Sequence, residues 1–202
     1  MTSKWQNLLE RTEVAEGHKI APCSEAEILE VETGLNITLP SDYKAFSKVF
    51  GGGQIGDCCI RRLDCEYLSF TDWNKEIIKE HKEVIEFLDL DVEVFGIVEN
   101  VVNTGFYFGE VIGYQFHFYF DLHSYSLADM SCDIYLISFE SRFGFYELGR
   151  DFFLFINNFA FGENEDDILG LIQKDGINSS MNREAIVRSL NRSPKIFTPG
   201  HL

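Results

Sequence analysis

The sequence predicts an α+β fold in which a mostly antiparallel sheet of about five or six strands is packed by helices. Two observations support this prediction. Apolar residues recur at helical spacing through the first part of the chain, and beyond residue 91 several segments alternate between apolar and polar residues. Helices followed by a run of strands and then one more helix are typical of α+β domains.

The chain is expected to begin with two helices. Residues 3–13 show the apolar spacing of a short helix around Trp5. Ser24 and Glu27 have the spacing of a capping box, in which each side chain satisfies a backbone N–H of the other residue. This pair therefore opens a second helix, which closes near Gly34.

The segment 36–55 contains the signals of a third helix and of the turn after it. Leu39-Pro40 breaks the preceding helix, because Pro disfavours the α region for the residue before it. Ser41 is expected to cap the new helix, and Asp42 places a carboxylate near its positive end. Gly51-Gly52-Gly53 is expected to end it. The apolar face consists of Tyr43, Phe46, Val49 and Phe50.

The remaining elements follow from periodicity. Residues 114–121 alternate, so Phe116, Phe118 and Phe120 are expected to face the core. Gln115, His117 and Tyr119 are expected to face solvent. The other expected strands are 54–62, 65–70, 92–99, 104–112, 133–139 and 143–147. The other expected helices are 75–88 and 151–161, and 124–132 is expected to be a loop.

The chain changes character near its C-terminus. A charged run at 163–167 follows the last strong helical signal, and basic residues outnumber acids after residue 176. We therefore expect one domain over residues 1–162 and a C-terminal extension over 163–202. The extension is expected to contain a short helix near 181–190 and an irregular end.

One block of sequence resembles a known family. Leu39-Pro40-Ser41-Asp42-Tyr43-Lys44-Ala45-Phe46, followed by a Gly-Gly turn into a strand, looks like the opening of the SUKH superfamily. The preceding helix at 24–34, and the segment 143–149 with the Phe-rich stretch 151–159, are similar as well. The resemblance covers about residues 24–160, so it implies that the expected domain over 1–162 is SUKH-like. This superfamily includes fungal cell-wall-synthesis regulators and many bacterial immunity proteins of polymorphic toxin systems.

Composition argues against several classes of partner. The net charge of −16 disfavours nucleic-acid binding, which needs cationic surface, and it disfavours docking on anionic membranes. No stretch approaches the length of about 20 apolar residues that a membrane span requires. The N-terminal residues lack the apolar run of a secretory signal, so we expect a cytoplasmic protein.

The motifs of enzymes and metal sites are not found in this sequence. It has no G-x-S-x-G, H-E-x-x-H, Walker or G-x-G-x-x-G pattern, and none of the five Cys are spaced as C-x-x-C. Cys58 and Cys59 are expected to alternate across a strand as small hydrophobic residues. His117 and His123 flank one strand end, where surface residues are a better interpretation than a metal pair. We expect no catalytic residue, no metal and no cofactor.

Clustered acids and loop aromatics are the candidate residues for binding a protein partner. Acids near the C-terminal end of a helix oppose its dipole at a small cost in stability. This cost suggests another role, such as pairing with Lys or Arg of a partner; a solvated loop is the simpler interpretation. The candidates are Glu86, Asp89, Asp91, Glu93, Glu163, Glu165, Asp166 and Asp167, with Tyr67 and Trp73 as possible aromatic anchors.

The resemblance and the charge together predict a non-enzymatic binding protein. The first hypothesis is a cytoplasmic immunity protein that neutralises a cognate, basic toxin domain by covering its active surface. The alternative is an intracellular regulatory or scaffold protein like the fungal cell-wall-synthesis regulators. An enzyme would require Cys58, Cys59 or a pair of carboxylates to be assembled in a pocket.

Overall fold

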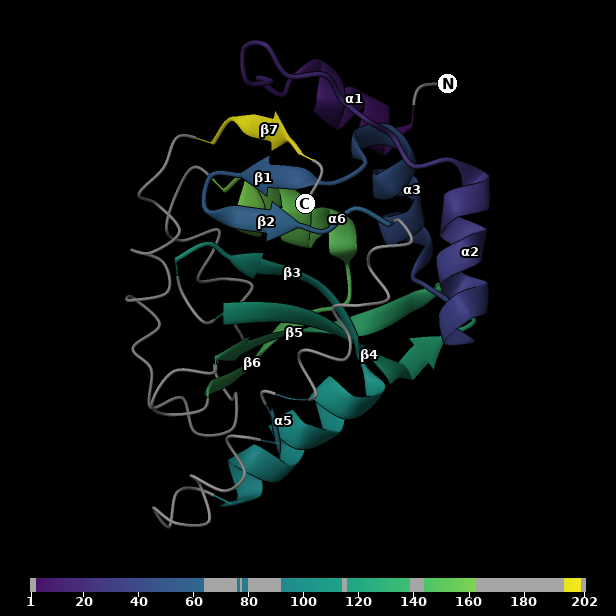
Figure 1. The fold of residues 1–202 in the computed structure, drawn as a ribbon, viewed down its shortest axis with the longest axis vertical. Helices are drawn as coiled ribbons and strands as arrows, with labels where there is room; N and C mark the ends of the chain where they lie inside the picture. Colours follow the sequence, from purple (N-terminus) through teal and green to yellow (C-terminus); the bar gives the residue numbers. More distant parts are fainter. Residues whose placement is uncertain are drawn as a thin grey trace.

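The computed structural model describes residues 3–63, 76, 78–79, 92–113, 116–138, 144–162 and 195–200. Its helices are α1 (Lys4–Glu10), α2 (Glu25–Leu35), α3 (Ser41–Phe50), α5 (Val92–Thr104) and α6 (Phe152–Leu154), and α6 continues into the π-helix η1 (Phe155–Ala160). Its strands are β1 (Gly53–Ile55), β2 (Cys58–Ile60), β3 (Phe106–Val111), β4 (Phe116–Ser126), β5 (Ser131–Ser138), β6 (Gly144–Gly149) and β7 (Phe197–Pro199). Figure 1 shows their arrangement. No helix among these residues is long and apolar enough to cross a membrane.

The N-terminal helices begin and end mostly where the sequence predicts. The capping box of α2 is present, with the Ser24 hydroxyl accepting from the Glu27 backbone and the Glu27 carboxylate accepting from the Ser24 backbone. The prediction that Ser41 caps α3 is wrong by one residue, because Pro40 occupies the cap position and no side chain caps this helix. Asp42 still lies in the first turn, where its carboxylate interacts favourably with the positive end of the helix dipole and accepts from Lys4 Nζ at 2.7 Å.

The predicted α+β class is confirmed, with one antiparallel sheet of seven strands in the order β6-β5-β4-β3-β2-β1-β7. The expected strand at 54–62 is a hairpin of β1 and β2, with the turn at Gly56, whose φ of +57° suits glycine. The expected loop at 124–132 is mostly the β4–β5 hairpin, since β4 runs to Ser126 and β5 begins at Ser131. The expected strand at 65–70 and most of the expected helix at 75–88 lie outside the described residues.

One predicted strand is a helix. Residues 92–99 belong to α5, which runs from Val92 to Thr104. The many β-branched residues of this segment favour a strand locally, but Phe95, Val98, Val101 and Val102 are spaced as a helical stripe, and all four are buried. Packing of that stripe on the sheet therefore outweighs the local preference.

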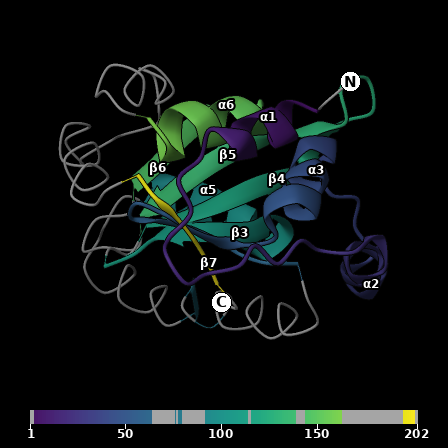
Figure 2. The same ribbon diagram turned by 90° about the horizontal axis from the view of Figure 1, so that it is seen from above.

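The sheet is buried on both faces. On one face, the Phe residues of β3 and β4 pack against α3, α6 and η1. Trp5 of α1 packs in turn on α3 and α6, and Figure 2 shows these helices over the strands. On the other face, α5 packs on Tyr107, Tyr119, Ile137 and Phe145. The predicted inward direction of Phe116, Phe118 and Phe120 is thus confirmed, but the solvent exposure predicted for His117 and Tyr119 is wrong, because α5 lies on that face.

The C-terminal strand closes the edge of the sheet next to β1. Gln54 faces Thr198 in this antiparallel pair, and Phe197 also pairs with Val14 on its other side. The Phe197 side chain is fully buried, with its ring 5.2 Å from that of Phe50. The expectation of an irregular chain end is therefore wrong for Phe197–Pro199. The division of the chain at residues 162 and 163 stays a prediction.

We expect Phe197→Ala to lower the free energy of unfolding by about 3–5 kcal/mol, because it empties a fully buried aromatic site. Urea denaturation measures this change. The control is Thr198→Ala on the same strand, where the side chain is only half-buried and the expected loss is below about 1 kcal/mol. Equal losses from the two variants would contradict a structural role for the Phe197 ring.

Candidate functional site

The described surface has more acids than cations, and most of its cations are already paired. Arg62 Nη2 lies 2.6 Å from Glu27 Oε1, and Lys44 Nζ lies 2.9 Å from Glu32 Oε1. Four further pairs join Lys4 to Asp42, Lys48 to Glu25, Arg61 to Glu110, and Arg150 to Asp133. These ion pairs hold neighbouring elements together and leave few positive charges to offset the remaining acids.

Several exposed acids have no cationic partner among the described residues. They are Glu10, Glu13, Glu16 and Glu30. Glu13 and Glu16 flank the segment that pairs with β7, where the backbone N–H of Ala15 donates to the carbonyl oxygen of Phe197 at 2.9 Å. The edge of the sheet at β7 is thus bordered by uncompensated negative charge.

The acids and aromatics predicted as partner-binding residues fall almost entirely outside the described part of the chain. These are Glu86, Asp89, Asp91, Glu163, Glu165, Asp166, Asp167, Tyr67 and Trp73. The backbone of Glu93 is described, and it lies in the first turn of α5 rather than at the entry to a strand. Their role in binding stays a prediction.

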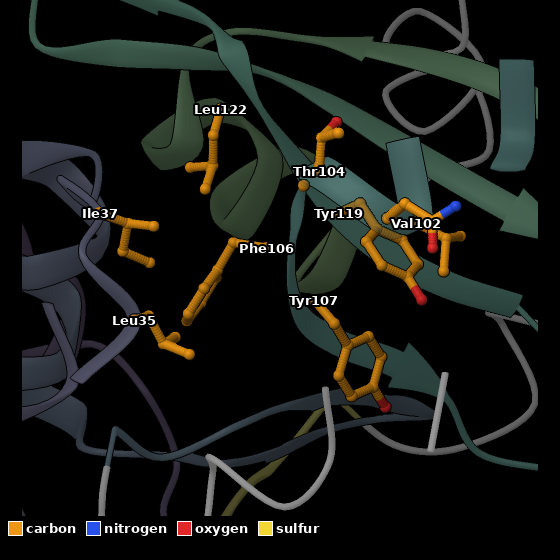
Figure 3. A pocket seen from close by; sticks show the side chains of 10 residues that line it. Leu35, Ile37, Val102, Thr104, Phe106, Tyr107, Tyr119 and Leu122 are labelled. Carbon is orange, nitrogen blue, oxygen red and sulfur yellow. The ribbon is translucent and has the colours of Figure 1, made fainter. Parts of the chain in front are cut away.

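A small pocket opens where three segments meet. It lies between the end of α2, the C-terminal turn of α5 and the strand pair β3–β4, and it has a volume of about 210 Å³. Figure 3 shows Leu35 and Ile37 on one side of it and Val102, Tyr107 and Tyr119 on the other. The hydroxyl groups of the two tyrosines point away from the two aliphatic side chains.

This pocket suits a side chain better than a metabolite. Its volume is below the range of about 300–1,000 Å³ that is typical of sites for drug-sized ligands. Its lining contains no acidic, basic, histidine or cysteine side chain, so it holds no group that could act as a general base or a nucleophile near neutral pH.

The face of the sheet beneath α5 contains a polar group of side chains that we call the Arg61 cluster: Arg61, Glu110, Tyr107, His117 and Tyr119. Arg61 Nη2 lies 2.7 Å from Glu110 Oε1, and the guanidinium carbon lies 5.7 Å from the centre of the Tyr107 ring. The Tyr107 ring centre is 5.3 Å from that of His117 and 5.6 Å from that of Tyr119. Sheet register explains the assembly, because Tyr107 faces Tyr119 and Glu110 faces His117 across β3 and β4.

The titratable groups of the Arg61 cluster are held in their neutral forms, apart from the ion pair. Burial, with a smaller contribution from the positive charge of Arg61, lowers the pKa of His117 to about 4. Burial also raises the pKa of Tyr107 and of Tyr119 above the ordinary tyrosine value. Tyr107 and Tyr119 pack the sheet against α5 and also line the pocket described above, and His117 is buried beside them.

Cys58 and Cys59 are packing residues, as expected. Cys23 and Cys132 are also buried, so every cysteine in the described part of the chain has a buried side chain. Burial raises the pKa of the Cys58 thiol and of the Cys59 thiol to about 12, so both stay protonated near neutral pH and are poor nucleophiles. Cys58 belongs to the larger core, and Cys59 points to the other face of β2.

Metal binding finds no support among the described residues, where no group of three or more His, Cys, Asp or Glu is close enough to hold an ion. His117 is buried, which corrects the expectation of a surface histidine. His123 lies six residues further along β4, a distance of about 20 Å in an extended strand, so the two imidazoles do not share a ligand.

The sequence analysis missed the Arg61 cluster. The signal lay in the alternation of β3 and β4, in which Phe occupies one face and Tyr, His or Glu occupies the other. Such alternation is typical of a strand with one solvated face, so the sequence favoured exposure for the second set. Only the position of α5 reverses that assignment.

The sequence profile of the SMI1 / KNR4 family (SUKH-1) matches residues 22–176, which is more than half of the chain. No curated protein gave a significant match. No solved structure gave one either.

The buried imidazole leads to a prediction about pH. A histidine with a lowered pKa in the folded state binds fewer protons than it does in the unfolded chain, so stability falls as pH falls from about 6.5 to about 4. We expect His117→Gln to lose less stability than the wild type over this range, as measured by urea denaturation at each pH. Equal losses of stability in the two proteins over this pH range would contradict a lowered pKa for His117. Glu27, whose pKa is lowered to about 2, loses stabilisation only from about pH 4.5 downward, and it does so equally in both proteins, so the difference between them reports on His117.

Proposed function

Because this chain belongs to the SMI1/KNR4 family (SUKH-1), we propose that it is a non-enzymatic immunity protein, which neutralises a cognate basic toxin domain by covering its active surface. The family is generally non-catalytic and contains both immunity and regulatory proteins. Charge is the observation that favours the immunity role. A net charge of −16 suits a partner that is strongly basic, as a toxin that acts on nucleic acid must be.

The ion pairs of the described surface support this proposal. Lysine and arginine side chains that already face carboxylates do not repel a basic partner as free cations would. Exposed acids such as Glu13, Glu16 and Glu30 then contribute to a negative field that extends about one Debye length, roughly 8 Å at physiological salt. Such a field steers a basic partner into encounter and raises the association rate.

The inhibition is steric in this proposal. The described residues form no group of three or more metal-ligating side chains, and their cysteine thiols are buried, which supports blocking of a bound toxin by occlusion rather than by modification. Surface charge sets the association rate in this proposal, and an apolar contact within the interface sets the dissociation rate of the complex.

The first experiment identifies the partner. The tagged protein is used to capture proteins from its source strain at low and at high salt, and each captured basic domain is then expressed alone and together with this chain. We expect one basic domain that is retained better at low salt, that stops growth when expressed alone, and that is tolerated when this chain is present. Specific capture of regulatory or wall-synthesis proteins, without any toxicity to suppress, would favour the regulator alternative and overturn the immunity role.

A second prediction concerns the acids without cationic partners. The triple variant Glu10→Gln, Glu13→Gln, Glu16→Gln is expected to bind the same partner several-fold more slowly at low salt, because it weakens the steering field. The difference should vanish at high salt, where the field is screened. Stopped-flow association measures both rates. The matched control is Lys19→Gln, which removes an exposed cation and is expected to change the rate slightly in the opposite direction.

A further inference from the structure

We propose that the tip of the β4–β5 hairpin, residues 127–130, is the anchor by which this protein binds its partner, and that the partner presents an apolar pocket bordered by lysine or arginine side chains. This inference rests on the proposed function, in that it takes the chain to be a protein-binding protein. It assigns the binding contact to a particular segment, which neither the family nor the net charge does.

The tip presents two large apolar side chains to solvent. Leu127 is 87 % exposed and Met130 is 52 % exposed. Neither side chain therefore adds much buried apolar area to the fold. Single exposed apolar residues are common on protein surfaces. Here two of them occupy one four-residue turn between Ser126 and Ser131, which face each other across the hairpin. The hydrophobic effect therefore favours covering this turn with a partner.

The hairpin that presents them is held rigidly. Arg150, which directly follows β6, donates from Nη1 to Asp133 at 2.9 Å and from Nη2 to the carbonyl oxygen of Ser124 at 2.8 Å. The same guanidinium also contacts the Oγ and the carbonyl oxygen of Ser131, at 3.3 Å and 3.2 Å. One side chain thus ties both strands of the hairpin to the edge of the sheet. A pre-organised contact loses less conformational entropy on binding than a mobile loop does.

The backbone at the tip adopts a conformation that is costly for a methionine. Met130 has a φ of +53°, in the left-handed region that favours Gly, Asn or Asp. Its carbonyl oxygen accepts a hydrogen bond from the backbone N–H of Ser41 at 2.9 Å, which fixes this conformation against the start of α3. Glycine would meet the same backbone requirement with no steric cost. Since the methionine side chain is half exposed, its contribution is better sought in binding than in folding.

Charge complementarity identifies the border of the partner's pocket. Asp129 lies between the two apolar residues, and its side chain is 56 % exposed. Hydrogen bonds from Ser126 and Ser131 lower the pKa of its carboxyl group, so it carries a negative charge near neutral pH. Its nearest cationic atom among the described ion pairs is Arg150 Nε, at 4.0 Å. Arg150 offsets this charge only in part, because the contact is long and the carboxylate is exposed, so Asp129 presents a complementary charge to a lysine or arginine of a partner that covers Leu127 and Met130.

The test uses the basic domain whose toxicity this chain suppresses, in purified form, and measures its affinity by titration. Leu127→Ser and Met130→Gly are each expected to weaken binding about 30-fold, as loss of an anchor residue does. Met130→Gly is expected to keep or raise the stability of the fold, which separates a binding defect from unfolding. The control is Ile112→Thr, which alters an exposed apolar residue at the opposite end of β4 and is expected to bind as the wild type does.

Contact in cells is tested with a photo-crosslinking residue. Leu127→p-benzoylphenylalanine is expected to form a covalent adduct with the same basic domain on irradiation. Ile112→p-benzoylphenylalanine is expected to form no such adduct. The inference is overturned if the variants bind within twofold of the wild type, or if position 127 crosslinks only to a second copy of this chain. Both results leave the proposed function standing, because the wild type still binds the toxic domain and suppresses it. Failure of the wild type to do so overturns both proposals.

Discussion

Aromatic packing between the strand pair β3–β4 and the helical layer is the interaction on which the rest of the structure depends. The ring of Phe108 lies 4.2 Å from that of Phe120, 5.6 Å from that of Phe152 and 5.5 Å from that of Phe155. Tyr43 joins the same group from α3, and its hydroxyl donates to the carbonyl oxygen of Arg61 at 3.1 Å. These contacts fix the orientation of the sheet, and with it the positions of the hairpins at its ends.

A sheet that is fully covered on one face by Phe can still carry polar side chains on the other. Here the second face is also covered, and its polar residues satisfy one another in part through the Arg61–Glu110 pair. The pair is only partly buried, with 11 % of the Arg61 side chain and 26 % of the Glu110 side chain exposed, so it avoids the full cost of removing two charges from water. Function is therefore expected from the ends of the sheet and from the surface charge, where the β4–β5 hairpin and the acids near β7 lie. This arrangement fits a protein that acts by contact.

Elements whose sequence signals are local could be predicted from the sequence. Elements whose conformation depends on packing against a distant segment of the chain could not. The capping box at Ser24 and Glu27 involves residues three positions apart, so it was predicted correctly. The change of periodicity after residue 91 predicts a strand over 92–99, but these residues belong to α5, because the sheet offers an apolar face on which their helical stripe packs. The binding residues that the sequence proposed lie mainly outside the described ranges, and they remain predictions.

By itself, the sequence determined the fold class, the family and the sign of the surface charge, because periodicity, a contiguous motif and composition depend on residue order alone. Only the tertiary structure decided that His117 and Tyr119 are buried, since this requires α5 to lie over their strand. It also decided that Phe197 joins β1, a pairing between residues more than a hundred positions apart. The same holds for the β4–β5 hairpin. Its sequence indicates a turn, but the rigid display of Leu127 and Met130 arises from Arg150, which reaches the hairpin only because β6 lies beside β5.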